Sequence, residues 1–184
     1  MALALSGTSN GSLNNLSLSS NTGTILDSAN TTFFGVDMWR VTTDLTTPSG
    51  TISSNLERVD DASYGRIGTG MTESSGVFTF PSTGIYQVMC HAEVQVTSTD
   101  GACVVDTMVT IDNYSYDYVA RTINGDNTSS STIQCGVSFA LVDVTDVSNV
   151  KVKFDCNSFG SGSNLLGNTN QTYTGFYFMR LGDT

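Results

Sequence analysis

The clearest pattern in the chain is a pair of alternating stretches, at 77–80 and 84–96, joined by a Pro/Gly turn. From Tyr86 onward the even positions are apolar and most odd positions are polar, which is the period of a strand with one buried face. Pro81 has no amide hydrogen to donate, so it suits the turn that Gly84 ends. The expected core face is Tyr86, Val88, Cys90, Ala92, Val94 and Val96, and the expected polar face is Gln87, His91, Glu93 and Gln95.

Similar runs recur along the chain, separated by segments rich in Gly, Asn, Asp and Ser. Further strands are expected at 33–41, 103–112, 116–124, 132–144, 150–156 and 172–181. An apolar strand face is expected at Ile133, Cys135, Val137, Phe139 and Leu141. The stretch 42–76 is read as turn-rich. About nine short strands without a convincing helix predict an all-β, two-sheet antiparallel sandwich, with a jelly roll as first choice and an immunoglobulin-like sandwich as second.

The amino-acid composition and net charge limit the classes of partner that the protein is expected to bind. The 184 residues are 39% hydrophobic and 13% charged, which fits one domain with a short appendage. A net charge of −10 would repel nucleic acid and anionic lipid surfaces, and the seven basic residues are scattered. No apolar run is long enough to span a bilayer, and the first residues do not form a secretory signal. We therefore expect a chain that folds in a cytoplasm, with no nucleic acid and no membrane among its partners.

The four cysteines fall within expected strands, at apolar-face positions, and none forms a C-x-x-C pair. Buried free thiols are the preferred interpretation. A disulfide between neighbouring strands is left open, because its geometry cannot be seen in the sequence. The cysteines are Cys90, Cys103, Cys135 and Cys156.

The N-terminal segment differs from the rest. Residues 1–39 contain no Lys or Arg, and their small polar residues are interrupted by single apolar ones, so this stretch cannot bury a core alone. We expect residues 1–32 to form an extended arm used for attachment or assembly, and 33–184 to form the sandwich domain. The candidate attachment residues are Leu3, Leu5, Leu13, Leu16 and Leu18.

Two motifs carry a family likeness. Phe78, followed by Gly84-x-Tyr86-x-Val88, resembles the trimeric jelly rolls of complement globular heads and tumour necrosis factor-like (TNF-like) domains. The last strand agrees, since Thr172–Phe178 resembles the aromatic closing strand that packs at the trimer centre in that family. The sequence departs from the family at Val88 and Cys90, where aromatics are favoured. The resemblance implies a homotrimer with an interface at Tyr173, Phe176, Tyr177 and Phe178.

A second resemblance covers the whole chain. The uncharged arm, followed by Asp37–Leu45 and Leu56–Asp61, is similar to small surface virion proteins of marine tailed phages. It implies a non-enzymatic capsid decoration (cement) protein on the virion surface, assembled in the host cytoplasm and bound by its arm to the major capsid protein or other virion proteins. The alternative is the receptor-binding tip of a tail fibre that recognises a host surface glycan. A free-standing lectin or enzyme has no sequence feature in its favour.

Candidate chemistry is sparse. His91 is the single histidine and is expected on a polar strand face, so no catalytic residue is expected. One His and four dispersed Cys do not suggest zinc, and no cofactor is expected. The acidic segments Asp60–Asp61 and Asp112–Asp117 are either calcium ligands or soluble loops. The alternate tyrosines Tyr114, Tyr116 and Tyr118 are either a core face or a surface for sugar stacking or protein contact.

Overall fold

A computed structural model of the protein describes residues 35–61, 64–97, 100–125 and 130–184. The chain divides into two units, Met1–Thr32 and Phe33–Thr184, and the structure concerns the second. The predicted arm with its five leucines lies outside the described residues, so its role stays a prediction. Within the described ranges, no helix is long and apolar enough to cross a membrane.

The described residues form two antiparallel sheets, which confirms the all-β sandwich expected from the sequence. Sheet A contains β1 (Val36–Val41), β2 (Thr43–Thr46), β4 (Leu56–Arg58), β5 (Arg66–Ile67), β8 (Gly84–Val96), β11 (Thr132–Val144), β13 (Asn164–Asn168) and β14 (Gly175–Gly182). Sheet B contains β3 (Gly50–Thr51), β6 (Thr72–Ser74), β7 (Val77–Thr79), β9 (Cys103–Thr110), β10 (Asp117–Asn124) and β12 (Lys151–Asn157).

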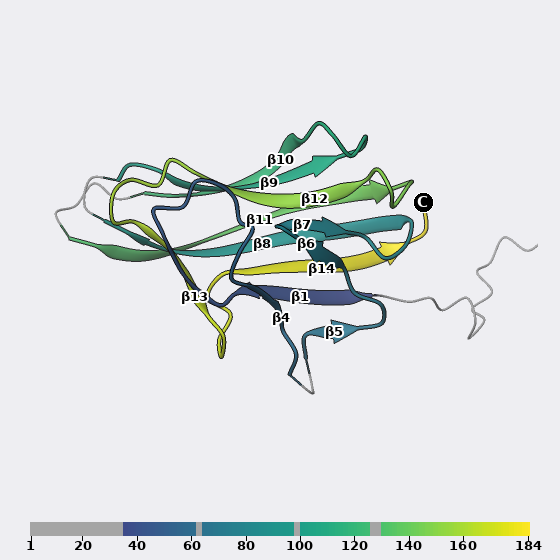
Figure 1. The fold of residues 1–184 in the computed structure, drawn as a ribbon, viewed down its shortest axis with the longest axis horizontal. Helices are drawn as coiled ribbons and strands as arrows, with labels where there is room; N and C mark the ends of the chain where they lie inside the picture. Colours follow the sequence, from purple (N-terminus) through teal and green to yellow (C-terminus); the bar gives the residue numbers. More distant parts are fainter. Residues whose placement is uncertain (1–34, 62–63, 98–99, 126–129) are drawn as a thin grey trace, which may run out of the picture. The chain divides into compact units, whose positions relative to one another are not determined.

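Strand β8 organises sheet A. The order is β2-β13-β8-β14-β1-β4, with β11 pairing with β8 and β5 pairing with β1. β11 pairs with the whole length of β8, whereas β14 and β13 share its other edge. The order in sheet B is β10-β9-β12-β7-β6, with β3 on β12. Figure 1 shows β10, β9 and β12 as one layer that faces β8, β14 and β1 across the core.

The faces of β8 are as the alternation predicts. Tyr86 and every second residue up to Val96 are buried, while Gln87 and its alternates are half-buried on the outside. The Tyr86 ring packs on Phe80 with ring centroids 4.7 Å apart, and its hydroxyl donates to the Ser82 carbonyl at 3.1 Å. Gly84 is required at the start of the strand, because a Cβ there would lie 2.6 Å from the carbonyl oxygen of Gly182.

Aromatic rings from both sheets fill the centre of the sandwich. Phe78 of β7 meets Trp39 of β1 and Phe178 of β14, with centroid distances of 5.4 and 5.1 Å. Phe154 of β12 stacks on Phe176 of β14 at 4.0 Å. Burying a ring of this size contributes about 1.5 to 3 kcal/mol. Both rings of β14 therefore belong to the core of the single chain.

A buried carboxylate joins β1 to the segment that follows it. Asp37 is almost fully buried and accepts hydrogen bonds from Arg58 Nε at 2.9 Å, Trp39 Nε1 at 2.9 Å and the Met71 amide at 2.7 Å. The Arg58 guanidinium also lies over the Trp39 ring, 4.7 Å from its centroid. These partners all donate to the Asp37 carboxylate, so its charge is buried at little cost. Asp37, the first residue of the Asp37–Leu45 motif, therefore stabilises the fold.

The segment 42–76 differs from the sequence expectation. It contains the short strands β2 to β6, which pair with longer strands such as β1 and β12, whereas a turn-rich loop was predicted. The cysteines differ in one position as well. Cys90, Cys103 and Cys156 are buried thiols, as expected, whereas Cys135 is exposed, and all four are unpaired.

Candidate interaction surface

The most unusual surface of the domain is the outward face of β11. Its odd-numbered residues from Ile133 to Leu141 are apolar and, like Asp143 at the end of the strand, point away from the core, whereas Ser138, Val142 and Val144 point inward and are buried. The exposed fraction of the large side chains lies between 58 and 66%. The apolar face expected from the sequence is real, but it faces outward in the single chain. Its residues are Ile133, Cys135, Val137, Phe139 and Leu141.

Space inside the sandwich explains this orientation. A Cβ at Gly136 would meet the Thr122 Cβ at 2.8 Å and the Asn124 side chain at 3.3 Å, so β10 approaches the inner side of β11 closely. Only small residues fit there, and β11 supplies Gly136, Ser138 and Ala140 on its even positions. The bulky odd-numbered residues are therefore left outside.

The apolar surface continues from β11 over β8 to β14. Phe139 is the cross-strand neighbour of Met89, and Met89 is the neighbour of Tyr177, so the three form one row across three strands. The next row is Leu141, Gln87 and Met179. Contiguous exposed apolar surface of this kind marks a protein contact more often than a solvent face. We call the outer sides of β11, β8 and β14 the apolar face.

Charge on the apolar face is limited to its two ends, at Asp143 of β11 and Glu93 of β8. Glu93 of β8 lies opposite Cys135 of β11 in register. Burial, followed by the nearby Glu93 carboxylate, raises the pKa of the Cys135 thiol. Burial also raises the pKa of Tyr177. Both groups therefore stay neutral near pH 7, which suits a surface that another chain covers.

The predicted trimer residues on the closing strand separate into two sets. Phe176 and Phe178 are buried in the core of the chain, so their assignment to a contact between chains is wrong. The strand has large rings on both sides, and the core takes these two. Tyr177 is half-buried on the apolar face, and Tyr173 is half-buried before β14 begins. Whether either tyrosine contacts a partner stays a prediction.

His91 lies on the apolar face rather than in a cleft. It is half-buried and lies between Val137 of β11 and Gly175 of β14 in register. Among the residues that the structure describes, its imidazole has no hydrogen bond or ion pair.

The two acidic segments have partners within the protein. Asp60 and Asp61 lie 3.9 and 4.0 Å from the Arg40 guanidinium, which also pairs with Glu57. Asp112 Oδ1 accepts the amides of Tyr114 and Ser115 at 2.8 and 2.7 Å, and these bonds lower the pKa of Asp112. No group of three or more metal-ligating side chains occurs in the described ranges.

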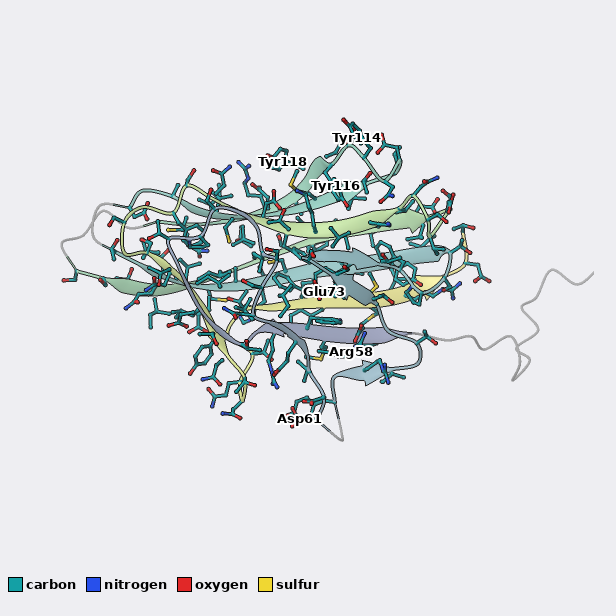
Figure 2. All side chains as sticks on the ribbon, in the orientation of Figure 1. Arg58, Asp61, Glu73, Tyr114, Tyr116 and Tyr118 are labelled. Atoms are coloured by element: carbon teal, nitrogen blue, oxygen red, sulfur yellow. The ribbon has the colours of Figure 1, made fainter. Side chains whose placement is uncertain are left out.

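The alternate tyrosines are not a core face. Tyr114 and Tyr118 are exposed and Tyr116 is half-buried. Figure 2 shows the three rings grouped beside β9 and β10, on sheet B, away from Arg58 and Asp61. The row is therefore exposed and not part of the core, and a role in sugar stacking or protein contact stays a prediction.

Comparison with known proteins supports the fold alone. No protein-family model and no curated protein matches the sequence. Among solved structures, murine APRIL at pH 5.0 aligns at 11% identity and a TM-score of 0.57, over 81% of this chain and 100% of that chain. Eiger TNF from S. frugiperda aligns at 13% identity and a TM-score of 0.58, over 82% and 94%. The domain is thus a TNF-like jelly roll, as its motifs predicted.

Proposed function

We propose that the apolar face is a contact between identical chains and that the protein is a homotrimer. The observation that supports the proposal is the column of large side chains on β11, beside Met89 and Tyr177. In a single chain these side chains would be exposed to water, and contact with a second copy of the chain would bury them. The number of copies comes from the likeness of Phe78 and the Gly84-x-Tyr86-x-Val88 motif to trimeric jelly rolls.

Light scattering with matched variants tests this proposal. We expect the wild type to have three times the 19.5 kDa mass of the chain at micromolar concentration. Leu141→Asp together with Phe139→Asp should give a folded monomer, because two carboxylates cannot be buried unpaired between apolar surfaces. Ile123→Asp is the control, since Ile123 is 60% exposed and lies on β10 of the opposite sheet. A monomeric wild type would refute the trimer.

The biological role that we propose is capsid decoration on a tailed-phage particle. The trimer would lie on the virion surface, with residues 1–32 bound to the major capsid protein or other virion proteins. Three features support this role: the arm without Lys or Arg, the net charge of −10, and the likeness of Asp37–Leu45 and Leu56–Asp61 to small virion proteins. Assembly would take place in the host cytoplasm.

Deletion of residues 1–32 separates attachment from folding. The core residues that the structure describes all belong to the second unit, so the truncated protein should fold and keep its oligomeric mass. It should lose binding to particles stripped of the wild-type protein, measured by co-sedimentation and by imaging of labelled protein on heads and tails. Unchanged attachment of the truncated protein would contradict the role of the arm.

We propose in addition that the protein is not an enzyme. The support is the position of its only histidine on a flat sheet face. Reproducible hydrolysis of polysaccharide or peptidoglycan by the wild type, abolished by His91→Gln, would overturn this part of the proposal.

The second candidate function is a receptor-binding tip of a tail fibre that recognises a host glycan. The observation in its favour is the exposure of Tyr114 and Tyr118 on the sheet opposite the apolar face. Labelled protein found at tail tips and not on heads would favour this candidate over decoration.

A further inference from the structure

The outer face of sheet B presents aromatic rings that are held in place by charged side chains. Lys153 Nζ lies 4.9 Å from the ring centroid of Tyr116, and the Arg121 guanidinium carbon lies 5.9 Å from that of Tyr118. Tyr114 and Tyr118 are 88 and 62% exposed. Cation–π contacts of this kind restrict the rings and leave their hydroxyl groups near water. We call Tyr114, Tyr116 and Tyr118 the tyrosine platform.

The charges beneath the tyrosine platform are paired. Asp106 is fully buried and accepts two hydrogen bonds from Arg121, at 2.6 and 3.2 Å. Asp155 lies opposite Asp106 in register and binds Lys153 Nζ at 3.1 Å. Thr51 Oγ1 donates to Asp155 at 2.7 Å and accepts from Lys153 at 3.2 Å. These groups form a fixed set of donors and acceptors beside the rings, because their side chains hold one another.

Backbone features position the tyrosines. The pairing of β10 with β9 shifts register between Tyr118 and Ala120, and a bulge of this kind redirects the side chains next to it. At the other end, the Asp112 carboxylate fixes the turn that carries Tyr114. The Asn113 amide in that turn donates to the Asn149 carbonyl at 3.0 Å. The backbone that carries the tyrosine platform is therefore fixed before any ligand arrives, which reduces the entropy cost of binding.

We propose that the tyrosine platform binds a neutral pyranose glycan. The apolar C–H side of a pyranose ring packs on a tyrosine ring, and its hydroxyl groups bond to exposed polar groups such as the Arg121 guanidinium. Arg121 keeps 48% of its side chain exposed and so can donate to such a ligand.

Two observations favour this ligand over others. A protein partner would have to dehydrate both ion pairs, and their charged groups interrupt the apolar surface, unlike on the apolar face. An anionic sugar or a phosphate would meet Asp112 and Asp117 beside the rings, on a chain of net charge −10. The site lies on the sheet opposite the apolar face and does not depend on the trimer.

Saturation-transfer NMR on the full chain tests the proposal. The probes are methyl α-mannopyranoside, methyl β-galactopyranoside, methyl β-glucopyranoside and the neutral tetrasaccharides of the same sugars, at about 10 mM, where even a millimolar site is mostly filled. We expect transfer to the ring C–H protons of at least one probe. Absence of transfer to every probe would overturn the proposal.

Matched variants locate the binding. Tyr114→Ala with Tyr118→Ala should weaken binding at least about tenfold, whereas Phe at both positions should keep it within about threefold, because stacking needs the ring and not the hydroxyl. Tyr64→Ala is the control, since Tyr64 is 58% exposed and lies between β4 and β5.

Two further results would refute the site. One is binding that survives the double Ala change. The other is loss of particle attachment by the double Ala variant without any sugar binding, which would make the tyrosine platform a protein contact. An unchanged mass of the variant in light scattering shows that the trimer is intact, so failure of this site and failure of the trimer can be told apart.

Discussion

The outer faces of the two sheets use the same alternating strands but leave different groups outside. On sheet A, Val137, Phe139 and Leu141 are exposed with few charges around them. On sheet B, Asp106 is buried beneath Arg121, and tyrosines cover the ion pairs. An apolar group outside a core needs another surface to cover it, whereas a paired charge is already satisfied and tolerates water. The two faces are therefore suited to different partners.

The largest effect on stability is expected in β8, because one side of this strand lies in the core and the other side lies on the apolar face. Tyr86→Ala should lower the free energy of unfolding by about 3 kcal/mol, because it removes a buried ring and its packing on Phe80. Gln87→Ala, on the outer side of the same strand, should change it by less than about 0.5 kcal/mol. Urea unfolding of both variants measures the difference. Equal losses would mean that the two sides of β8 are not distinguished as described.

The next effect concerns the buried charge of sheet B. Arg121→Ala leaves the fully buried Asp106 without its partner and should lower the free energy of unfolding, by less than for a completely buried pair because Arg121 is half-exposed. Arg66→Ala, on the exposed strand β5, is the control and should be almost neutral. A loss as small as that of the control would show that Asp106 does not depend on Arg121.

The thiol of Cys135 reports on coverage of the apolar face. In the Phe139→Asp, Leu141→Asp monomer, we expect Cys135 to react with a disulfide reagent at least about tenfold faster than in the trimer. Because its pKa is raised, the rate should stay below that of an ordinary thiol near neutral pH and increase as pH rises. The buried Cys103 and Cys156, with pKa values of about 11 and about 12, should stay unreactive. Identical rates in both proteins would indicate an uncovered face.

The smallest effect is expected at His91. His91→Gln keeps a polar side chain of similar reach on the outer side of β8, so the unfolding free energy should change by less than about 0.5 kcal/mol and the oligomeric mass should not change. Calorimetry and light scattering check both values. Dissociation of the variant would assign the imidazole a role in the contact between chains.

The sequence could predict β8 in full and β11 only in part. In β8 the charged and amide side chains mark the outer face, so the buried side follows directly. In β11 Phe139 and Leu141 alternate with Ser138 and Ala140, and the single charged residue, Asp143, lies near the end of the strand, so it marks the outer side only weakly. The inner side was decided by the closeness of β10 at Gly136, a contact between strands distant in sequence. Alternation identifies two faces but does not say which one has room inside.

The short strands of 42–76 escaped prediction for a related reason. β3 and β5 have two residues each, too few for any period, and they are strands only because β12 and β1 lie beside them. The tyrosine platform could be found as a motif, but its exposure and its cations come from the packing of Tyr116 on Lys153 of β12. Contacts between strands that are distant in the chain cannot be predicted from the local sequence.

The pairing of β1 with β14 has a consequence for the order of events during synthesis. Trp39 of β1 lies opposite Phe176 of β14 in the sheet. The first strand of the domain can therefore form this pairing only after the last strand has left the ribosome. Contacts between such distant positions make folding slow, and unpaired strands are exposed meanwhile. The 1–32 segment emerges before any of them. Its small polar residues and scattered leucines give nascent strands little apolar surface with which to aggregate. The arm can therefore stay unbound until the domain has folded.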